Sequence, residues 1–293
     1  MTSTRNPGLE DTTNVLAVPR RSVGQTLLAS GTVLALVVLI IFFFAMRPDV
    51  FLSFTNVRNI LYQVAILAII AGAQTIVMVV GDFDLSVAAT SALAGAVAAS
   101  MMLNGVPVAP AILAALVVGL LIGLINGALV AYLNLSAFVA TLATLTSVTG
   151  LAFLVTDGTT LFNLPPEFNF LGQGRFLEIP MPVFIAIAIS LILWFVLRFT
   201  TLGRRWYAIG GNAEVSRLSG VNVRRARLLA FTVAGLVSAI GGILLAARLG
   251  SASAVQGEDN LLFSVAAVFL GMTSSDPVRR TSSARWSASR SSA

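Results

Sequence analysis

The fold of this chain is decided by segments such as VAPAILAALVVGLLIGLINGALVAY, which occupies residues 108–132 and contains no charged side chain. This segment exceeds the roughly 20 apolar residues that a helix needs to cross the ~30 Å hydrocarbon core of a bilayer. Of the 293 residues, 57% are hydrophobic and 10% are charged. Soluble domains are only about 45–50% apolar and about 25% charged. The composition therefore predicts an integral membrane protein.

The membrane segments are predicted to be helices, because the alternating strands of a membrane barrel are absent from the sequence. We expect an all-α, polytopic helix bundle with about eight transmembrane segments, the last one short. The apolar segments lie at residues 26–46, 60–80, 85–103, 108–132, 137–155, 181–199, 228–247 and 261–272. They form one transmembrane domain at 26–273, between a polar N-terminal tail at 1–25 and a polar, basic C-terminal tail at 274–293. Small residues four positions apart, as in Gly119, Gly123 and Gly127, predict close packing of these helices.

Arginine indicates on which side of the membrane the connections lie. All 18 basic residues are Arg, and seven of them fall in RFTTLGRRWYAIGGNAEVSRLSGVNVRRAR, at residues 198–227. Basic residues close to membrane segments stay on the cytoplasmic side, so we expect this connection and the N-terminus in the cytoplasm. Nucleic acid is not an expected partner, because no soluble basic domain carries the charge.

The same basic connection has the signals of a short helix at residues 213–219. Asn212 is placed to cap its N-terminus, and Gly220 is placed to end it. A capped helix is more than a simple connection between two spans requires. We therefore predict that this helix is a docking surface on the cytoplasmic side.

A second candidate site is GDFDLS, at residues 81–86, between two apolar segments. Acidic residues at a membrane are costly unless they are solvated, paired or placed at a helix start. Asp84 and Ser86 fit a helix start at the membrane surface. The alternative is that Asp82 and Asp84 form a gate or bind a proton or cation.

Neutral polar residues inside the apolar segments complete the candidate gate or translocation path: Asn126, Thr141 and Thr144. Amides and hydroxyls suit an uncharged polyol, because they replace water around its hydroxyl groups without an opposing charge. The alternative use of a Thr hydroxyl is a bond to the backbone of its own helix.

Enzyme chemistry is not expected of this chain. It has no Cys and no His, which argues against thiol catalysis and against the His and Cys clusters that hold zinc. It also has no Lys, and the phosphate-binding loop of many nucleotide hydrolases requires one. We therefore expect no metal, no cofactor and no ATP hydrolysis by that route.

Three segments resemble, in the correct order, signature blocks of the ribose/xylose-type permeases of bacterial ABC sugar importers. Residues 81–87 are similar to GGIDLSV, and residues 134–158 are similar to PPFIATLGT…GLA…TGG. Residues 203–221 are similar to GRRIYAIGGNPEAARLSGI. The resemblance extends from about residue 30 to residue 273, and it places the chain with the branched-chain amino acid/sugar permease superfamily.

This resemblance implies a permease subunit of an ATP-driven importer of a monosaccharide or related polyol, in the bacterial plasma (inner) membrane. The implied partners are an ABC ATPase subunit that uses the ATP, an extracytoplasmic sugar-binding protein and a second permease copy in a homodimer. The loop that couples the permease to the ATPase would contain Gly210, Gly211, Asn212, Glu214, Arg217, Leu218 and Gly220.

The chain departs from the family pattern at two places. Asp82 stands where the signature has its second Gly. After Gly271 the family continues with a Gly-rich turn and further apolar spans, whereas SSDPVRRTSSARWSASRSSA follows residue 273 here. We expect a truncated or frameshifted C-terminus, and the alternative is a genuine short basic tail. The rival functions are an ion-coupled secondary transporter that uses Asp82 or Asp84, and a membrane scaffold without transport.

Overall fold

The computed structural model describes residues 31–275, so the predicted tail at 1–25 and nearly all of the tail at 274–293 lie outside the described residues. The chain divides into two units, Met1–Phe51 and Leu52–Ala293. The described part of the first unit holds helices α2 (Gly31–Met46) and α3 (Pro48–Phe51). Within it, the rings of Phe43 and Phe51 stack with their centroids 6.4 Å apart.

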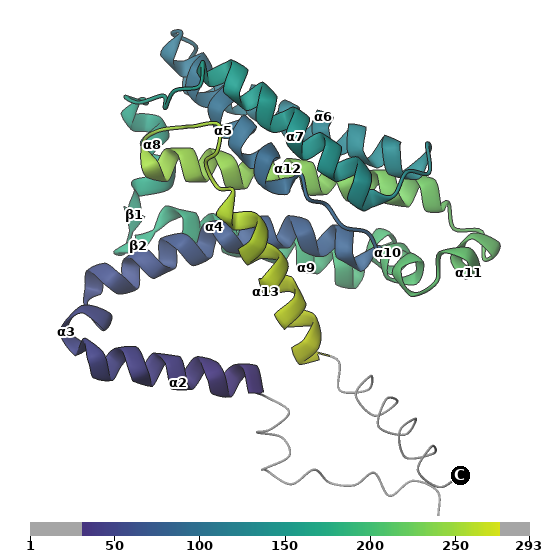
Figure 1. Cartoon of the computed structure of the whole chain (residues 1–293), viewed down its shortest axis with the longest axis horizontal. Helices are drawn as coiled ribbons and strands as arrows, with labels where there is room; N and C mark the ends of the chain where they lie inside the picture. Colours follow the sequence, from purple (N-terminus) through teal and green to yellow (C-terminus); the bar gives the residue numbers. More distant parts are fainter. Residues whose placement is uncertain (1–30, 276–293) are drawn as a thin grey trace, which may run out of the picture. The chain divides into compact units, whose positions relative to one another are not determined.

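The regular elements in the described part of the second unit are helices and one short hairpin (Figure 1). Its elements are α4 (Phe54–Val79), α5 (Val87–Leu103), α6 (Val108–Ala131), α7 (Ala137–Thr156), α8 (Pro166–Gln173), β1 (Arg175–Phe176), β2 (Ile179–Pro180), α9 (Met181–Phe199), α10 (Thr201–Gly211), α11 (Ala213–Leu218), α12 (Val223–Leu249) and α13 (Asp259–Ser275).

Within the described residues, each predicted apolar segment overlaps a helix, but the count of eight spans is not confirmed. Among the described residues, five helices are long and apolar enough to cross a membrane, namely α4, α6, α7, α9 and α12. The apolar parts of α2, α5 and α13 are shorter. Helix α13 is nevertheless longer than the predicted segment 261–272, because it begins at Asp259 and continues to Ser275. The expectation of an all-α, polytopic membrane protein is confirmed.

Helix α12 is the centre of the second unit. It packs against α4, α5 and α6. In its apolar stretch of 18 residues 67% are buried, a larger share than in any other candidate span of the described residues. Where α12 crosses α6, a Cβ atom at Gly119 would lie only 2.6 Å from the carbonyl oxygen of Gly235. Apolar contact gives helices little net attraction in lipid, so small residues that let backbones approach closely stabilise such crossings. The predicted role of the small-residue stripe is confirmed at this crossing.

The connection at residues 157–180 contains both short helix and strand. Helix α8 begins after Pro165, and β1 pairs with β2 in an antiparallel hairpin in which Arg175 faces Pro180. Paired backbone bonds join this connection to the segment just after α12, with Leu161 N–H donating to the Ala252 carbonyl at 2.8 Å. This connection therefore contains one short helix, with a small hairpin after it.

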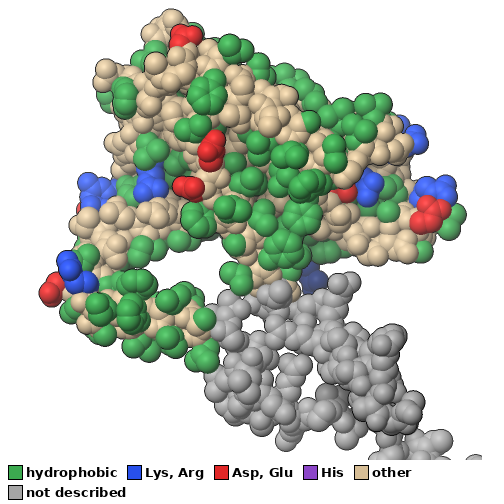
Figure 2. All heavy atoms as spheres, viewed as in Figure 1, with side chains coloured by type: hydrophobic (Ala, Val, Ile, Leu, Met, Phe, Trp, Pro, Cys, Tyr) green, Lys and Arg blue, Asp and Glu red, His purple; other side chains and the backbone are tan. Residues whose placement is uncertain are grey.

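Exposed apolar side chains cover much of the described surface. Figure 2 shows hydrophobic side chains over much of the visible face, with few charged side chains among them. On α9, for example, Ile192 and Phe195 are more than half exposed. Such a surface suits a lipid environment, where apolar side chains need no burial inside the protein.

Candidate functional site

Helix α11 is short and capped at both ends. The Asn212 side chain accepts hydrogen bonds from the backbone N–H groups of Glu214 and Val215, both at 3.0 Å. At the other end, Gly220 adopts a φ of +84°, and its N–H donates to the Arg217 carbonyl at 3.0 Å. The predicted N-cap at Asn212 is confirmed, whereas the C-cap is Ser219, one residue before the predicted Gly220, which follows it directly. The caps hold a helix of only six residues in a fixed shape.

The exposed face of α11 is partly apolar. Val215 is 57% exposed and Leu218 is 73% exposed. Beside them, Arg217 Nε donates to Glu214 Oε2 at 3.0 Å, and this bond lowers the pKa of the Glu214 carboxyl below its ordinary value. Large exposed apolar side chains beside an ordered charge pair, on a polar connection outside the spans, are typical of a protein–protein contact.

Helix α10 was missed by the sequence analysis, which predicted one short helix in this connection. Its N-terminus is capped by the Thr200 hydroxyl, which accepts from Gly203 N–H at 3.2 Å. Trp206 and Ile209, three positions apart, are buried on its inner face, and Trp206 Nε1 donates to the Ala226 carbonyl of α12 at 2.8 Å. The cap and this spacing were the signals that would have identified α10. The helix fixes α11 against the start of α12.

The predicted coupling residues do not all lie on one surface. Asn212, Glu214, Arg217, Leu218 and Gly220 belong to α11 and its caps. Gly210 instead packs against the end of α4, because a Cβ atom there would overlap the Val79 carbonyl oxygen. Gly211 has open space at its Cβ position.

In the loop between α4 and α5, three consecutive residues, Gly81, Asp82 and Phe83, each contact a different helix. The Cβ position of Gly81 lies 3.5 Å from the Gly210 Cα of α10. Asp82 Oδ2 lies 3.1 Å from Arg227 Nε of α12, an ion pair whose N–H is not aligned for a hydrogen bond. The ring of Phe83 lies 5.8 Å, between centroids, from that of Phe269 on α13.

The rest of this loop joins a buried hydrogen-bond network. Asp84 Oδ1 accepts from the Ser86 backbone N–H at 2.8 Å and from the Ser86 hydroxyl at 2.6 Å. The Ser86 hydroxyl in turn accepts from Asn126 Nδ2 of α6 at 2.7 Å. Asn126 Oδ1 accepts from the Thr144 hydroxyl of α7 at 2.6 Å, and Thr141 Oγ1 accepts from Leu85 N–H at 3.1 Å.

Of the six residues predicted for a gate or translocation path, four are therefore linked in one hydrogen-bond chain, and Thr141 joins the same loop through the backbone N–H of Leu85. The exception is Asp82, which pairs with Arg227 instead. The sequence analysis gave a bond within the same helix as the alternative use of a Thr hydroxyl. The hydroxyls of Thr141 and Thr144 form such bonds and also bond to another segment. Because buried polar groups in a low-dielectric interior are costly when unpaired, this network fixes the loop to α5, α6 and α7.

Burial shifts the pKa of both carboxyl groups in the loop between α4 and α5. It raises the pKa of Asp82 above its ordinary value, and the nearby Arg227 guanidinium opposes that rise. It also raises the pKa of Asp84, which the two bonds from Ser86 oppose. In both cases removal of water from around the carboxylate is the larger cause. The Asp82–Arg227 ion pair is therefore lost as the pH falls through the pKa of Asp82.

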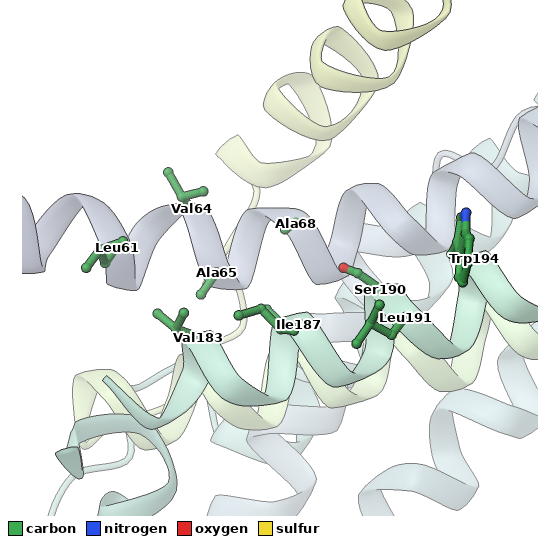
Figure 3. Close-up of a pocket in the computed structure, with 10 residues that line it drawn as sticks. Leu61, Val64, Ala65, Ala68, Val183, Ile187, Ser190, Leu191 and Trp194 are labelled. Atoms are coloured by element: carbon green, nitrogen blue, oxygen red, sulfur yellow. The ribbon is translucent and has the colours of Figure 1, made fainter. Parts of the chain in front are cut away.

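An apolar groove of about 400 Å³ lies between α4 and α9 (Figure 3). Apart from Ser190 and the indole of Trp194, the side chains that line it are aliphatic, among them Leu61, Val64 and Ile187. A polyol needs several hydrogen-bonding partners to replace its water, and this groove offers too few. We therefore do not assign it to a sugar.

Comparison with known proteins identifies the family to which this chain belongs. Residues 56–282 match the family described as "Branched-chain amino acid transport system / permease component". This chain belongs to that family. No solved structure matches it.

Relatives of this permease carry names that specify sugars. It is 38% identical to the ribose import permease of Haemophilus influenzae over 86% of this chain and 79% of the relative. It is 41% identical to the ribose import permease of Bacillus subtilis over 83% and 76%. Its identity with the D-allose transport system permease of Escherichia coli is 32% over 83% and 75%.

The family membership confirms several expectations from the sequence. The chain is a permease component and not an enzyme, and it needs no cofactor of its own. It is a multi-pass protein of the plasma membrane. The resemblance drawn from residues 81–87, 134–158 and 203–221 is confirmed.

Proposed function

We propose that this permease is the membrane subunit of an ATP-driven importer of a monosaccharide or related polyol. The observation that carries the proposal is its identity of 37–41% with ribose import permeases of three species over most of the chain. Relatives named for D-allose and L-arabinose point to the same class of neutral, hydroxyl-rich substrates. A separate ABC ATPase subunit would use the ATP, and an extracytoplasmic binding protein would deliver the sugar.

The docking site for the ATPase would be helix α11, with Asn212, Glu214, Arg217, Leu218 and Gly220 forming the helix and its caps. Its fixed shape and its exposed apolar face support this assignment. The Arg-rich connection around it supports a cytoplasmic position, because Arg near membrane segments stays inside. The N-terminus would then also be cytoplasmic, with about eight spans as the sequence predicts and a second copy of the chain completing a homodimer.

The loop at residues 80–86 would transmit movement from α11 to the membrane helices. Gly81 and Asp82 contact α10 and α12, the two helices on either side of α11. Asp84 and Leu85 are bonded through the buried network to α5, α6 and α7. A displacement of α11 therefore reaches three membrane helices through one short, hydrogen-bonded segment, which suits a transition between discrete packed states.

Replacing Asp82 by Ala is expected to lower uptake per ATP hydrolysed by about tenfold, because Arg227 is left half-buried without its partner. The reciprocal double variant, Asp82→Arg with Arg227→Asp, should recover part of that loss. The matched control is Arg225→Ala, since Arg225 is exposed and has no salt bridge within residues 34–272. Equal coupling ratios in Asp82→Ala and wild type would contradict the proposed role of the loop.

The structure and the relatives do not favour the ion-coupled alternative. Asp82 is already paired with Arg227, and Asp84 already accepts two hydrogen bonds from Ser86. A cation site would need oxygen ligands left open to the ion. No group of three or more acidic side chains suited to a metal ion occurs among the described residues.

The proposal is tested by reconstituting the full chain with its ATPase and binding protein in vesicles. Uptake of radiolabelled D-ribose should require ATP and both partners, and it should persist when ion gradients are collapsed by ionophores. D-allose and L-arabinose serve as competing substrates that define the sugar class. Uptake that needs an ion gradient and proceeds without ATP would refute the proposal.

A further inference from the structure

A second pocket, of about 440 Å³, lies between α4, the end of α12 and the start of α13. Its volume falls within the ~300–1,000 Å³ range of small-molecule sites. In contrast to the groove between α4 and α9, its lining includes several hydrogen-bonding side chains and one aromatic ring: Gln63, Arg248, Gln256, Asp259, Asn260 and Phe263. None of these residues belongs to the coupling helix or to the buried network.

The pocket lies at the opposite end of the long helices from α11. On α12, Arg248 is next to the last residue, whereas α11 is joined to the first. On α4, Gln63 lies in the first half of the helix, whereas Val79 at the other end meets Gly210 of α10. If α11 faces the cytoplasm, the pocket faces the side from which an imported sugar arrives.

The side chains of the pocket suit the hydroxyl groups of a neutral sugar. Each sugar hydroxyl both donates and accepts, and the amides of Gln63, Gln256 and Asn260 offer both functions. Arg248 adds donors and Asp259 adds acceptors, and neither forms a salt bridge within the described part of the chain. The charges of this pair balance, so the pocket has no net preference for an ion.

Two of these side chains are held in place for a ligand. The Arg248 guanidinium carbon lies 5.4 Å from the centroid of the Tyr62 ring, and the Tyr62 hydroxyl is itself fixed by donating to the Gln173 carbonyl at 3.1 Å. Gln256 Oε1 accepts from Ser253 N–H at 2.9 Å, which orients the amide. Its Nε2 is buried and has no hydrogen-bond partner among the described residues. A buried amide donor without a partner is costly, and a ligand oxygen would remove that cost.

Further unpartnered polar groups lie deeper along the same helices. Gln74 on α4, Thr90 on α5 and Ser238 on α12 are fully buried, and their side-chain polar atoms have no hydrogen-bond partner within residues 34–272. Gln74 and Ser238 lie between the pocket and the cytoplasmic end of their helices. The Cβ position of Gly257, which lines the pocket, lies 3.6 Å from the hydroxyl of Ser91, the neighbour of Thr90. Hydrogen-bonding groups therefore continue inward from the pocket.

We propose that this pocket is an entry site that binds the hydroxyl groups of a neutral monosaccharide before the sugar moves inward between α4, α5 and α12. The inference rests on the proposed function, because it takes the substrate class from it. Phe263 provides an exposed ring for the C–H face of the sugar, and the surrounding amides bind its hydroxyls.

The absence of cysteine from the chain allows a direct test. Gln63→Cys and Phe263→Cys place single thiols on two sides of the pocket, both at exposed positions. In nanodiscs, a hydrophilic methanethiosulfonate should label each thiol about tenfold more slowly when D-ribose is present at about ten times its dissociation constant. Leu218→Cys on α11 is the control and should react at the same rate with and without D-ribose.

A third substitution tests the assignment of the buried amide. Adding Gln256→Ala to Gln63→Cys should raise the D-ribose concentration for half-protection by about tenfold, because hydrogen bonds to the sugar are lost. Glycine betaine at equal osmolality should protect neither thiol. Labelling of both pocket thiols that is the same with D-ribose and with glycine betaine would overturn the proposal. Since these readouts need no ATPase, they fail or succeed independently of the uptake experiment that tests the proposed function.

Discussion

Leu218→Arg is expected to reduce ATP-driven uptake by roughly 100-fold, which is the effect of removing a central contact from a protein interface. Leu218 is 73% exposed on α11 and contributes little to the fold of the permease itself. A charged side chain there would have to be buried against the ATPase without a partner. Uptake in reconstituted vesicles and co-purification with the ATPase should both fall, while membrane insertion and the melting temperature stay unchanged.

Conservative changes at the same helix provide the controls. Leu218→Met keeps an apolar side chain of similar size, so it should retain uptake close to wild type. Glu214→Arg should weaken docking as Leu218→Arg does, because it replaces the partner of Arg217 by a like charge, whereas Glu214→Gln keeps a hydrogen-bond acceptor. Normal uptake by Leu218→Arg and Glu214→Arg would show that α11 is not the docking site.

Gly235→Leu is expected to abolish the folded permease. A Cβ atom at Gly235 would lie 2.9 Å from the Cα of Gly123 and would overlap the carbonyl oxygen of Gly119. The obstructing atoms are backbone, so the new side chain is accommodated only if α6 and α12 move apart along their crossing. Overpacking typically costs about 1–3 kcal/mol, and more where the backbone must shift, against a total stability of roughly 5–15 kcal/mol.

The matched control for this variant is Gly150→Leu on α7. Gly150 is a helical glycine on an exposed surface, and its Cβ position has no other atom within 4 Å. The monodisperse fraction after extraction in detergent, and its melting temperature, should be preserved in Gly150→Leu and lost in Gly235→Leu. Gly235→Ala should be intermediate. If both Leu variants behave alike, close packing at Gly235 does not stabilise the fold.

The membrane helices could be predicted from the sequence because lipid imposes a length and a composition on them. Within residues 31–275, each predicted apolar segment overlaps a helix of the structure. The number of spans could not be settled in the same way, because α5 has only 17 residues, many of them small, and so is close to the shortest helix that crosses a bilayer. Helix α10 was missed because its buried face is set by packing against α12, through Trp206, rather than by lipid.

The polar residues of the candidate site could be predicted from the sequence, but the hydrogen bonds and ion pairs between them could not. Asp84, Ser86, Asn126, Thr141 and Thr144 were identified as polar residues in apolar surroundings. That Ser86 would bond to Asn126, forty positions away, depends on the rotation of α6 against the 80–86 loop, which no local pattern specifies. For the same reason the separation of Asp82 from Asp84, and its pairing with Arg227, became visible only in the structure.

Helix α5 is almost wholly enclosed by its neighbours, and this has a consequence for how the protein is made. Its alanine, serine and glycine side chains give the translocon a weak signal, because insertion favours Leu, Ile, Phe and Val. Its main partners beside α7 are α6 and α12, and the last of these begins only at Val223. A ribosome that has just completed α5 therefore holds a segment whose companions are still unmade. We therefore expect α5 to be held in its final place only after α12 has been inserted beside it.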